Sequence, residues 1–150
     1  MEEITLFGLM FEAHKLVNIN TYLFDWDLSP VEGKGLYVGG HENYGHIEIK
    51  IYKSLERRSK MIWNLTPEQL PDELEAKRGV EQALRFFISY FEGIRGESIP
   101  LVFEINDGSY HAVDSKARNY ITATIYAIVD CFAKNSIAFW SHRLTRKNKY

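Results

Sequence analysis

The feature that most constrains this chain is a long amphipathic pattern over residues 72–96. Its apolar side chains recur at alternating steps of four and three residues, which places them on one stripe of an α-helix: Val80, Leu84, Phe87, Phe91 and Ile94. Phe86, Ile88 and Tyr90 widen that stripe. A helix with so many aromatic residues needs a broad apolar surface to pack against. In a chain of 150 residues, that surface is a β-sheet.

Alternation with a period of two predicts strands before and after this helix. The clearest case is 46–53, where Ile47, Ile49 and Ile51 alternate with polar residues, as in an antiparallel strand with one solvated face. Residues 4–11 fit either a strand or a helix face, and their Ile, Thr and Phe content favours a strand. Composition and alternation predict further strands at 16–26, 35–38, 99–105, 110–113 and 137–140, with Asn106-Asp107-Gly108 as a hairpin turn.

A second helix is predicted from Asp114 or Ser115 to Lys134, with apolar residues at four-three-four spacing. The order of strands, helix, hairpin and helix predicts a single α+β domain over residues 1–150. We expect a mainly antiparallel sheet with two helices packed on one face. Residues 143–150 carry four basic side chains, and we expect a frayed polar tail there.

Charge and composition limit the environment and the partners. The formal net charge of −2 does not favour nucleic acid as a partner, and no apolar run approaches the ~20 residues that a membrane span needs. The single cysteine, Cys131, cannot form an internal disulfide, and the start Met1-Glu2-Glu3 is acidic where a secretory signal is basic. We therefore expect a cytoplasmic protein that does not bind membranes.

The segment Glu48-Ile49-Lys50 places a carboxylate and an ammonium group on the same side of a predicted strand. This string resembles, over a few residues, the E-x-K motif of metal-dependent nucleases of the PD-(D/E)xK class. The resemblance implies Asp27 or Asp25 as a second metal ligand and Lys50 as the group that positions the attacking water. A Glu-x-Lys pair is also typical of any solvated strand face.

His41, Glu42 and His46 are residue types that bind zinc, and three such ligands with an open position suit catalysis. Their spacing matches no recognised ligand pattern. Polar loop residues account for them equally well, so the sequence predicts no metal site and no cofactor.

The chain contains no phosphate-binding loop and no dinucleotide fingerprint, which favours a binding protein over an enzyme. We expect an inhibitor of the type of a bacterial toxin immunity protein, whose acidic, aromatic surface blocks the basic active site of a toxin or nuclease. The acidic side chains would mimic phosphates. The expected binding residues are Asp25, Trp26, Asp27, Glu42, Tyr44 and Glu48.

Two alternatives remain open at this point. One is the metal-dependent nuclease that uses Asp27, Glu48 and Lys50 as catalytic residues. The other is a small-ligand-binding module with a pocket between the sheet and the face formed by Phe86, Phe87 and Phe91. The sequence leaves the oligomeric state open.

Overall fold

The computed structural model describes residues 13–40 and 43–147, and for 134–147 it describes the course of the helix alone. The elements follow one another as η1 (Ala13–Ile19, a 3-10 helix), α2 (Asn20–Asp25), β1 (Val31–Val38), β2 (Tyr44–Lys53), β3 (Lys60–Trp63), η2 (Asp72–Leu74, a 3-10 turn), α3 (Ala76–Arg95), β4 (Leu101–Ser109) and α4 (Ala117–Lys147). Within the described part of the chain, no helix is long and apolar enough to span a membrane.

The four strands form one sheet in the order β1-β2-β4-β3. The β1–β2 and β2–β4 pairs are antiparallel, whereas β3 and β4 run parallel. Parallel neighbours need a crossover connection, and here α3 supplies it between β3 and β4. The prediction of a mainly antiparallel sheet is therefore confirmed, with one parallel pair at its edge.

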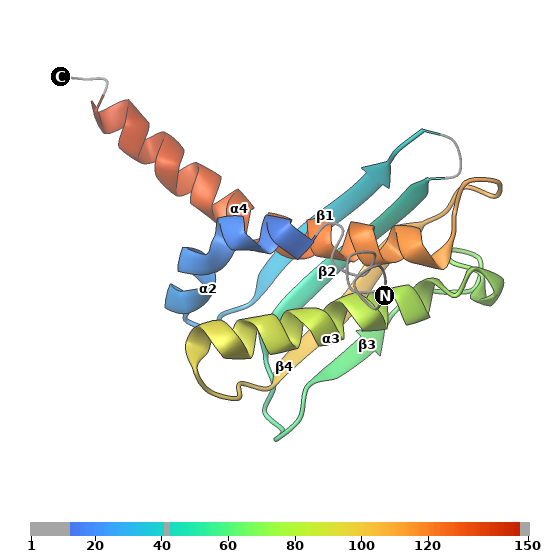
Figure 1. Ribbon diagram of the computed structural model, residues 1–150, viewed down its shortest axis with the longest axis horizontal. Coiled ribbons are helices and arrows are strands. Elements are labelled where there is room, and N and C mark those ends of the chain that lie inside the picture. The colour runs from blue at the N-terminus through green and yellow to red at the C-terminus, as the bar shows by residue number, and fades with distance from the viewer. Residues whose placement is uncertain (1–12, 41–42, 148–150) are drawn as a thin grey trace, which may run out of the picture.

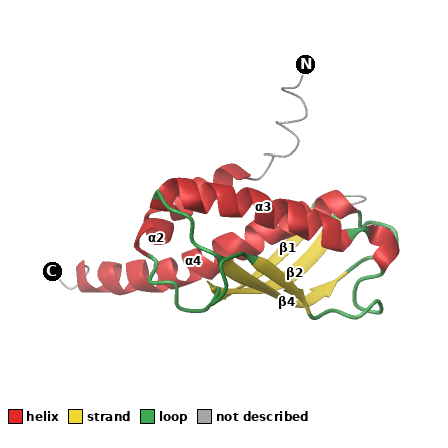
Figure 2. Cartoon of the chain, turned by 90° about the horizontal axis from the view of Figure 1, so that it is seen from below, coloured by secondary structure: helices red, strands yellow, loops and turns green. Residues whose placement is uncertain are grey.

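The helices α3 and α4 lie together on one face of the sheet, as Figures 1 and 2 show. The side chains of Ile47, Ile49 and Ile51 point into the layer between sheet and helices and are almost fully buried. Residues 46, 48 and 50 point to the opposite side, which we call the open face because α3 and α4 leave it uncovered. The single α+β domain with helices on one face is confirmed.

The predicted long helix is present as α3, and its stripe fills the core as expected. Val80, Leu84, Phe87 and Phe91 are buried, and the Phe87 ring meets Phe103 of β4 edge to face, with 6.1 Å between ring centroids. Gly96 ends the helix in the left-handed region, at a φ of 72°, where glycine has no steric penalty.

The second helix, α4, crosses β1 at very close range. A Cβ on Gly35 would lie 1.9 Å from the Ala123 carbonyl oxygen, and one on Gly33 would lie 2.2 Å from that of Ala127. Glycine at both positions therefore lets the helix backbone touch the strand backbone.

Helix α4 is longer than predicted. It continues to Lys147 and extends beyond the sheet (Figure 1), so the strand predicted at 137–140 is wrong. Residues 143–147 of the predicted tail belong to this helix, and residues 148–150 lie outside the described residues.

The strand predicted at 16–26 is also wrong, because this stretch forms η1 and α2. Leu16, Ile19 and Leu23 are fully buried and are spaced by three and four residues, which is a helical period. The asparagines and threonine between them gave a misleading alternation. The expected strand at 4–11 lies outside the described residues.

The predicted hairpin is wrong as well. Strand β4 continues through Asn106-Asp107-Gly108 to Ser109, and residues 110–113 form no strand. Pairing with β2 along the whole length of β4 outweighs the local preference of Asn-Asp-Gly for a turn. The sequence also missed β3 and the first four residues of β1.

Candidate functional site

An irregularity in β4 decides which of its side chains reach the open face. Ile105 pairs with Ile49, but Asp107 pairs with Glu48, so Asn106 is an extra residue in a β-bulge. In a regular strand, Asp107 would point to the same side as Ile105, toward the helices. The bulge instead turns Asp107 and the following Ser109 to the open face.

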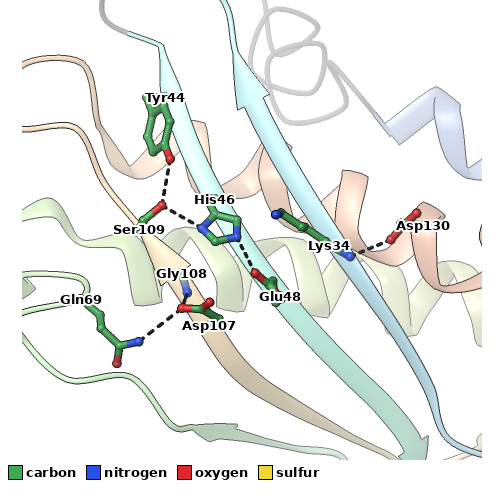
Figure 3. Close-up of polar contacts among 9 residues, drawn as sticks. All are labelled: Lys34, Tyr44, His46, Glu48, Gln69, Asp107, Gly108, Ser109 and Asp130. Carbon is green, nitrogen blue, oxygen red and sulfur yellow. Dashed lines mark hydrogen bonds and ion pairs between the residues drawn. The ribbon is translucent and has the colours of Figure 1, made fainter.

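A chain of hydrogen bonds joins the Ser109 side chain to β2 (Figure 3). The Ser109 Oγ lies 2.8 Å from the Tyr44 hydroxyl and 2.8 Å from His46 Nδ1. On the other side of the ring, His46 Nε2 lies 2.8 Å from Glu48 Oε2. Tyr44, His46, Glu48, Asp107 and Ser109 are called the open-face cluster below. His46 is only 9% exposed, whereas the Glu48 side chain is 37% exposed.

Asp107 is oriented from two directions. Its Oδ1 accepts hydrogen bonds from the Gly108 backbone N–H at 2.8 Å and from Gln69 Nε2 at 3.3 Å. Gln69 is itself fixed by two reciprocal bonds: the Thr66 N–H donates to its side-chain oxygen, and its own N–H donates to Thr66 Oγ1. This segment forms a turn. The ligand atoms of His46, Glu48 and Asp107 all lie within 4.8 Å of one another.

Lys50 belongs to a second polar group farther along β2. Its register partner on β4 is Glu104, which accepts a hydrogen bond from the Tyr52 hydroxyl. That bond lowers the pKa of Glu104, and the Lys50 charge lowers it further; the same bond raises the pKa of Tyr52. The Lys50 ammonium also lies 5.8 Å from the centroid of the Tyr52 ring. Lys50 is therefore engaged with Glu104 and Tyr52.

Asp25, Trp26 and Asp27 gather elsewhere, around a hollow of about 300 Å³ that we call the acidic hollow. Its other lining residues are Tyr22, Ser29, Val31 and Phe132. Trp26 is only 8% exposed and forms a wall of the hollow, with its ring packed edge-on against Phe91 at 5.6 Å and Phe132 at 5.1 Å.

The segment that carries the Asp25 and Asp27 carboxylates is held in place by hydrogen bonds within the segment and from Arg95. The Trp26 Nε1–H donates to the Ser29 carbonyl oxygen at 2.9 Å, and Arg95 donates to the carbonyl oxygens of Leu23 and Trp26. The Ser29 hydroxyl and backbone N–H both donate to Asp27 Oδ1, and these bonds lower the pKa of the exposed Asp27. Asp27 thus stays ionised at lower pH than an ordinary aspartate.

The structure divides the predicted binding residues between two places. Asp25, Trp26 and Asp27 surround the acidic hollow, and Tyr44 and Glu48 belong to the open-face cluster. Glu42 lies outside the described residues. Sequence reasoning missed Asp107 and Ser109, because nothing in the local sequence marks the bulge that turns them to the open face.

The structure does not bring together the predicted nuclease residues. Asp27 precedes β1 and lines the hollow with Phe132 of the helical layer, whereas Glu48 projects from the open face opposite Lys34 in the middle of β1. The start of β1, at Val31, is three residues from Lys34, or about 10 Å along the strand. Asp27 and Glu48 are therefore not placed to bridge one ion.

The pocket predicted beside the Phe86-Phe87-Phe91 face is filled by protein. Phe87 and Phe91 are fully buried and pack on each other, with 5.9 Å between ring centroids. A hollow of about 360 Å³ lies instead between β3 and α3, lined in part by Met61, Leu84, Ile88 and Phe103.

Comparison with known proteins finds similar folds but no protein that indicates an activity. No protein-family model matches the chain, and no curated protein matches it. Solved structures do match, among them a crystal structure of a protein from Thermus thermophilus, with 22% sequence identity and a TM-score of 0.53. The match covers 71% of this chain and 16% of that protein, so this chain spans about one sixth of its length. At this identity the likeness concerns the fold alone.

Proposed function

We propose that this chain is a non-enzymatic protein that binds a basic partner protein through the acidic hollow, in the manner of a toxin immunity protein. One observation carries the proposal: Asp25 and Asp27 share one hollow with an aromatic wall formed by Trp26. A lysine or arginine side chain has a charged head on an apolar stem. The two carboxylates suit the head, and the aromatic wall suits the stem.

The hollow is held in shape without a partner, which reduces the ordering cost of binding. Arg95 fixes the backbone around Asp25, Ser29 fixes the Asp27 carboxylate, and two aromatic rings fix Trp26. The toxin would be inhibited because the basic side chains that it uses to hold phosphates would be paired with Asp25 and Asp27. Tyr44 and Glu48 lie on the open face and take no part in this contact.

The test uses an acetylated hexa-arginine peptide as the probe of basic side chains. Titration into the ¹⁵N-labelled full chain is expected to shift the indole N–H of Trp26 and the amides of residues 25–29. The double variant Asp25→Lys/Asp27→Lys should weaken peptide binding about tenfold or more, and added salt should weaken it in the wild type.

The matched control is Glu68→Lys/Glu73→Lys, which makes the same change in net charge at two exposed residues outside the hollow. It should lower affinity far less than the double variant at Asp25 and Asp27. Equal losses in both variants, or shifts spread evenly over the surface, would refute the acidic hollow as the recognition site. A positive result justifies inhibition assays with basic toxins.

A further inference from the structure

We propose that His46, Glu48 and Asp107 form a binding site for a divalent transition-metal ion, with zinc as the best match. The three ligand atoms lie within 4.8 Å of one another. Around a tetrahedral zinc ion with bonds of about 2.0–2.2 Å, ligand atoms are roughly 3.4 Å apart. Small rotations of the two surface carboxylates therefore suffice to close the site, because the buried imidazole is already fixed between Ser109 and Glu48.

The donor set favours zinc over the hard cations. One imidazole nitrogen and two carboxylate oxygens are ligands that zinc accepts, whereas magnesium and calcium prefer oxygen ligands throughout. Three protein ligands leave a fourth position, and on the open face that position points to solvent. This is the arrangement of a zinc ion that keeps a bound water.

The hydrogen bonds around the three ligands are those that a metal site uses to orient them. Ser109 accepts the Nδ1–H of His46 in the tautomer that presents Nε2 to the metal. Gln69 and the Gly108 N–H both donate to Oδ1 of Asp107, and Oδ2 would then serve as the metal ligand. These outer contacts come from two separate segments of the chain, β4 and the turn that carries Gln69, and they distinguish the trio from a group of unrelated surface acids.

Metal binding at this site must compete with a proton. The proton between His46 Nε2 and Glu48 has to leave, either to Nδ1 or to the solvent, before Nε2 can bind the ion. Glu48 and Asp107 are the acids that face the ring, Tyr44 reaches it through Ser109, and Lys34 is the cation opposite Glu48 on β1.

The experiment is calorimetric titration of the full chain with zinc chloride, using Asp107→Asn and Glu48→Gln. Both substitutions keep the side-chain size and remove one ligand charge, and each should weaken zinc binding about tenfold or more. The control is Glu32→Gln, which removes a carboxylate of β1 on the same face and should leave the affinity unchanged. Cobalt(II) in place of zinc should give the intense visible absorption of a tetrahedral site.

Three outcomes would overturn the proposal: no heat up to about 1 mM zinc, equal affinity in all three variants, or a ring of His46 whose NMR signals do not shift when zinc is added. The last measurement uses the wild type, so it remains decisive if a variant fails to fold. The site lies on the open face and shares no residue with the acidic hollow, so either proposal can fail while the other stands.

Discussion

Glu48 on β2 and Asp107 on β4 are register partners because β4 contains one residue more than β2 over the same stretch. The extra residue, Asn106, takes no partner on β2, and the side chains after it change faces. The bulge absorbs this extra residue, and the Asp107 carboxylate therefore meets the open face and not the apolar core.

Two single-residue deletions test this relationship. Deleting Asn106 should give a regular β4 in which Asp107 still faces Glu48, and zinc affinity should be retained. Deleting Asp107 should give the same regular strand with Asn106 opposite Glu48, and zinc affinity should fall about tenfold or more. Calorimetry on the two proteins measures the difference, since they differ only in having Asp or Asn at that position.

Both deletion proteins are expected to fold. Each loses or shifts the hydrogen bond between Asn64 Nδ2 and Asn106 Oδ1, which costs about 1 kcal/mol of unfolding free energy. Thermal melting followed by circular dichroism checks this. Collapse of the fold in both would mean that β4 needs its bulge for pairing, and would contradict the proposed role of Asn106.

The close crossing of α4 over β1 predicts a large effect of one methyl group. In Gly35→Ala the new Cβ would meet the Ala123 carbonyl oxygen, and backbone cannot move aside as a flexible side chain can. We expect a loss of about 3 kcal/mol or more in the free energy of unfolding, measured by urea denaturation.

The matched control is Gly93→Ala in α3, where a new Cβ meets nothing within 4 Å. Gly93 is exposed in the helix interior, so alanine should raise the free energy of unfolding by about 1 kcal/mol. The two Gly→Ala substitutions should thus change the free energy of unfolding in opposite directions. A mild effect of Gly35→Ala would show that α4 can shift away from β1.

Ionisation of the Tyr120 hydroxyl should lower the free energy of unfolding at alkaline pH. Its ring is fully buried in α4, and its hydroxyl donates to the Ser109 carbonyl oxygen at 2.8 Å. Burial raises the pKa of Tyr120 to about 12, from 10.0. Because the folded-state pKa is the higher one, its contribution is complete below pH 10 and is lost as the pH rises from about 10 to 12.

The Tyr120→Phe variant has no hydroxyl to ionise at this position. It should therefore not lose the part of the unfolding free energy that the wild type loses through Tyr120 as the pH rises. At neutral pH the variant should be about 1 kcal/mol less stable, because the Ser109 hydrogen bond is gone. The gap between wild type and variant should shrink or reverse by pH 11–12, a change of about 2–3 kcal/mol. Parallel stability curves for the two proteins would contradict the assignment.

Ser29 should control the ionisation of Asp27. In Ser29→Ala the pKa of Asp27 should rise toward its ordinary value, since the hydroxyl bond is the largest cause of its lowering. The backbone N–H bond remains, so the rise should be partial. Carboxyl ¹³C chemical shifts followed over acidic pH measure it, and Ser29→Thr, which keeps a hydroxyl, should behave like the wild type.

The parts of the fold that were predicted correctly depend on local periodicity. The stripe of α3 and the alternation of β2 are long, and burial in the structure follows them. The segment 16–26 was misassigned because its alternating polar residues outweighed the three- and four-residue spacing of Leu16, Ile19 and Leu23.

The candidate sites were predicted only in part, for a physical reason that differs between them. Glu48 was placed correctly on a solvated strand face, but its neighbour Asp107 lies 59 positions away in sequence, and pairing across the sheet brings them together. Trp26 was expected to anchor a partner. Its burial depends on how α3 and α4 pack around it, which no local pattern contains.

The order of strands in the sheet has a consequence for synthesis on the ribosome. Strand β4 lies between β2 and β3, yet it is the last of the described strands to be made. Until residue 109 has left the ribosome, β2 and β3 have no neighbour to join them, and their inner edges stay unpaired. The nascent chain must therefore wait until β4 has been made before the sheet can close, and during that time it is exposed to wrong strand pairing and to capture by chaperones.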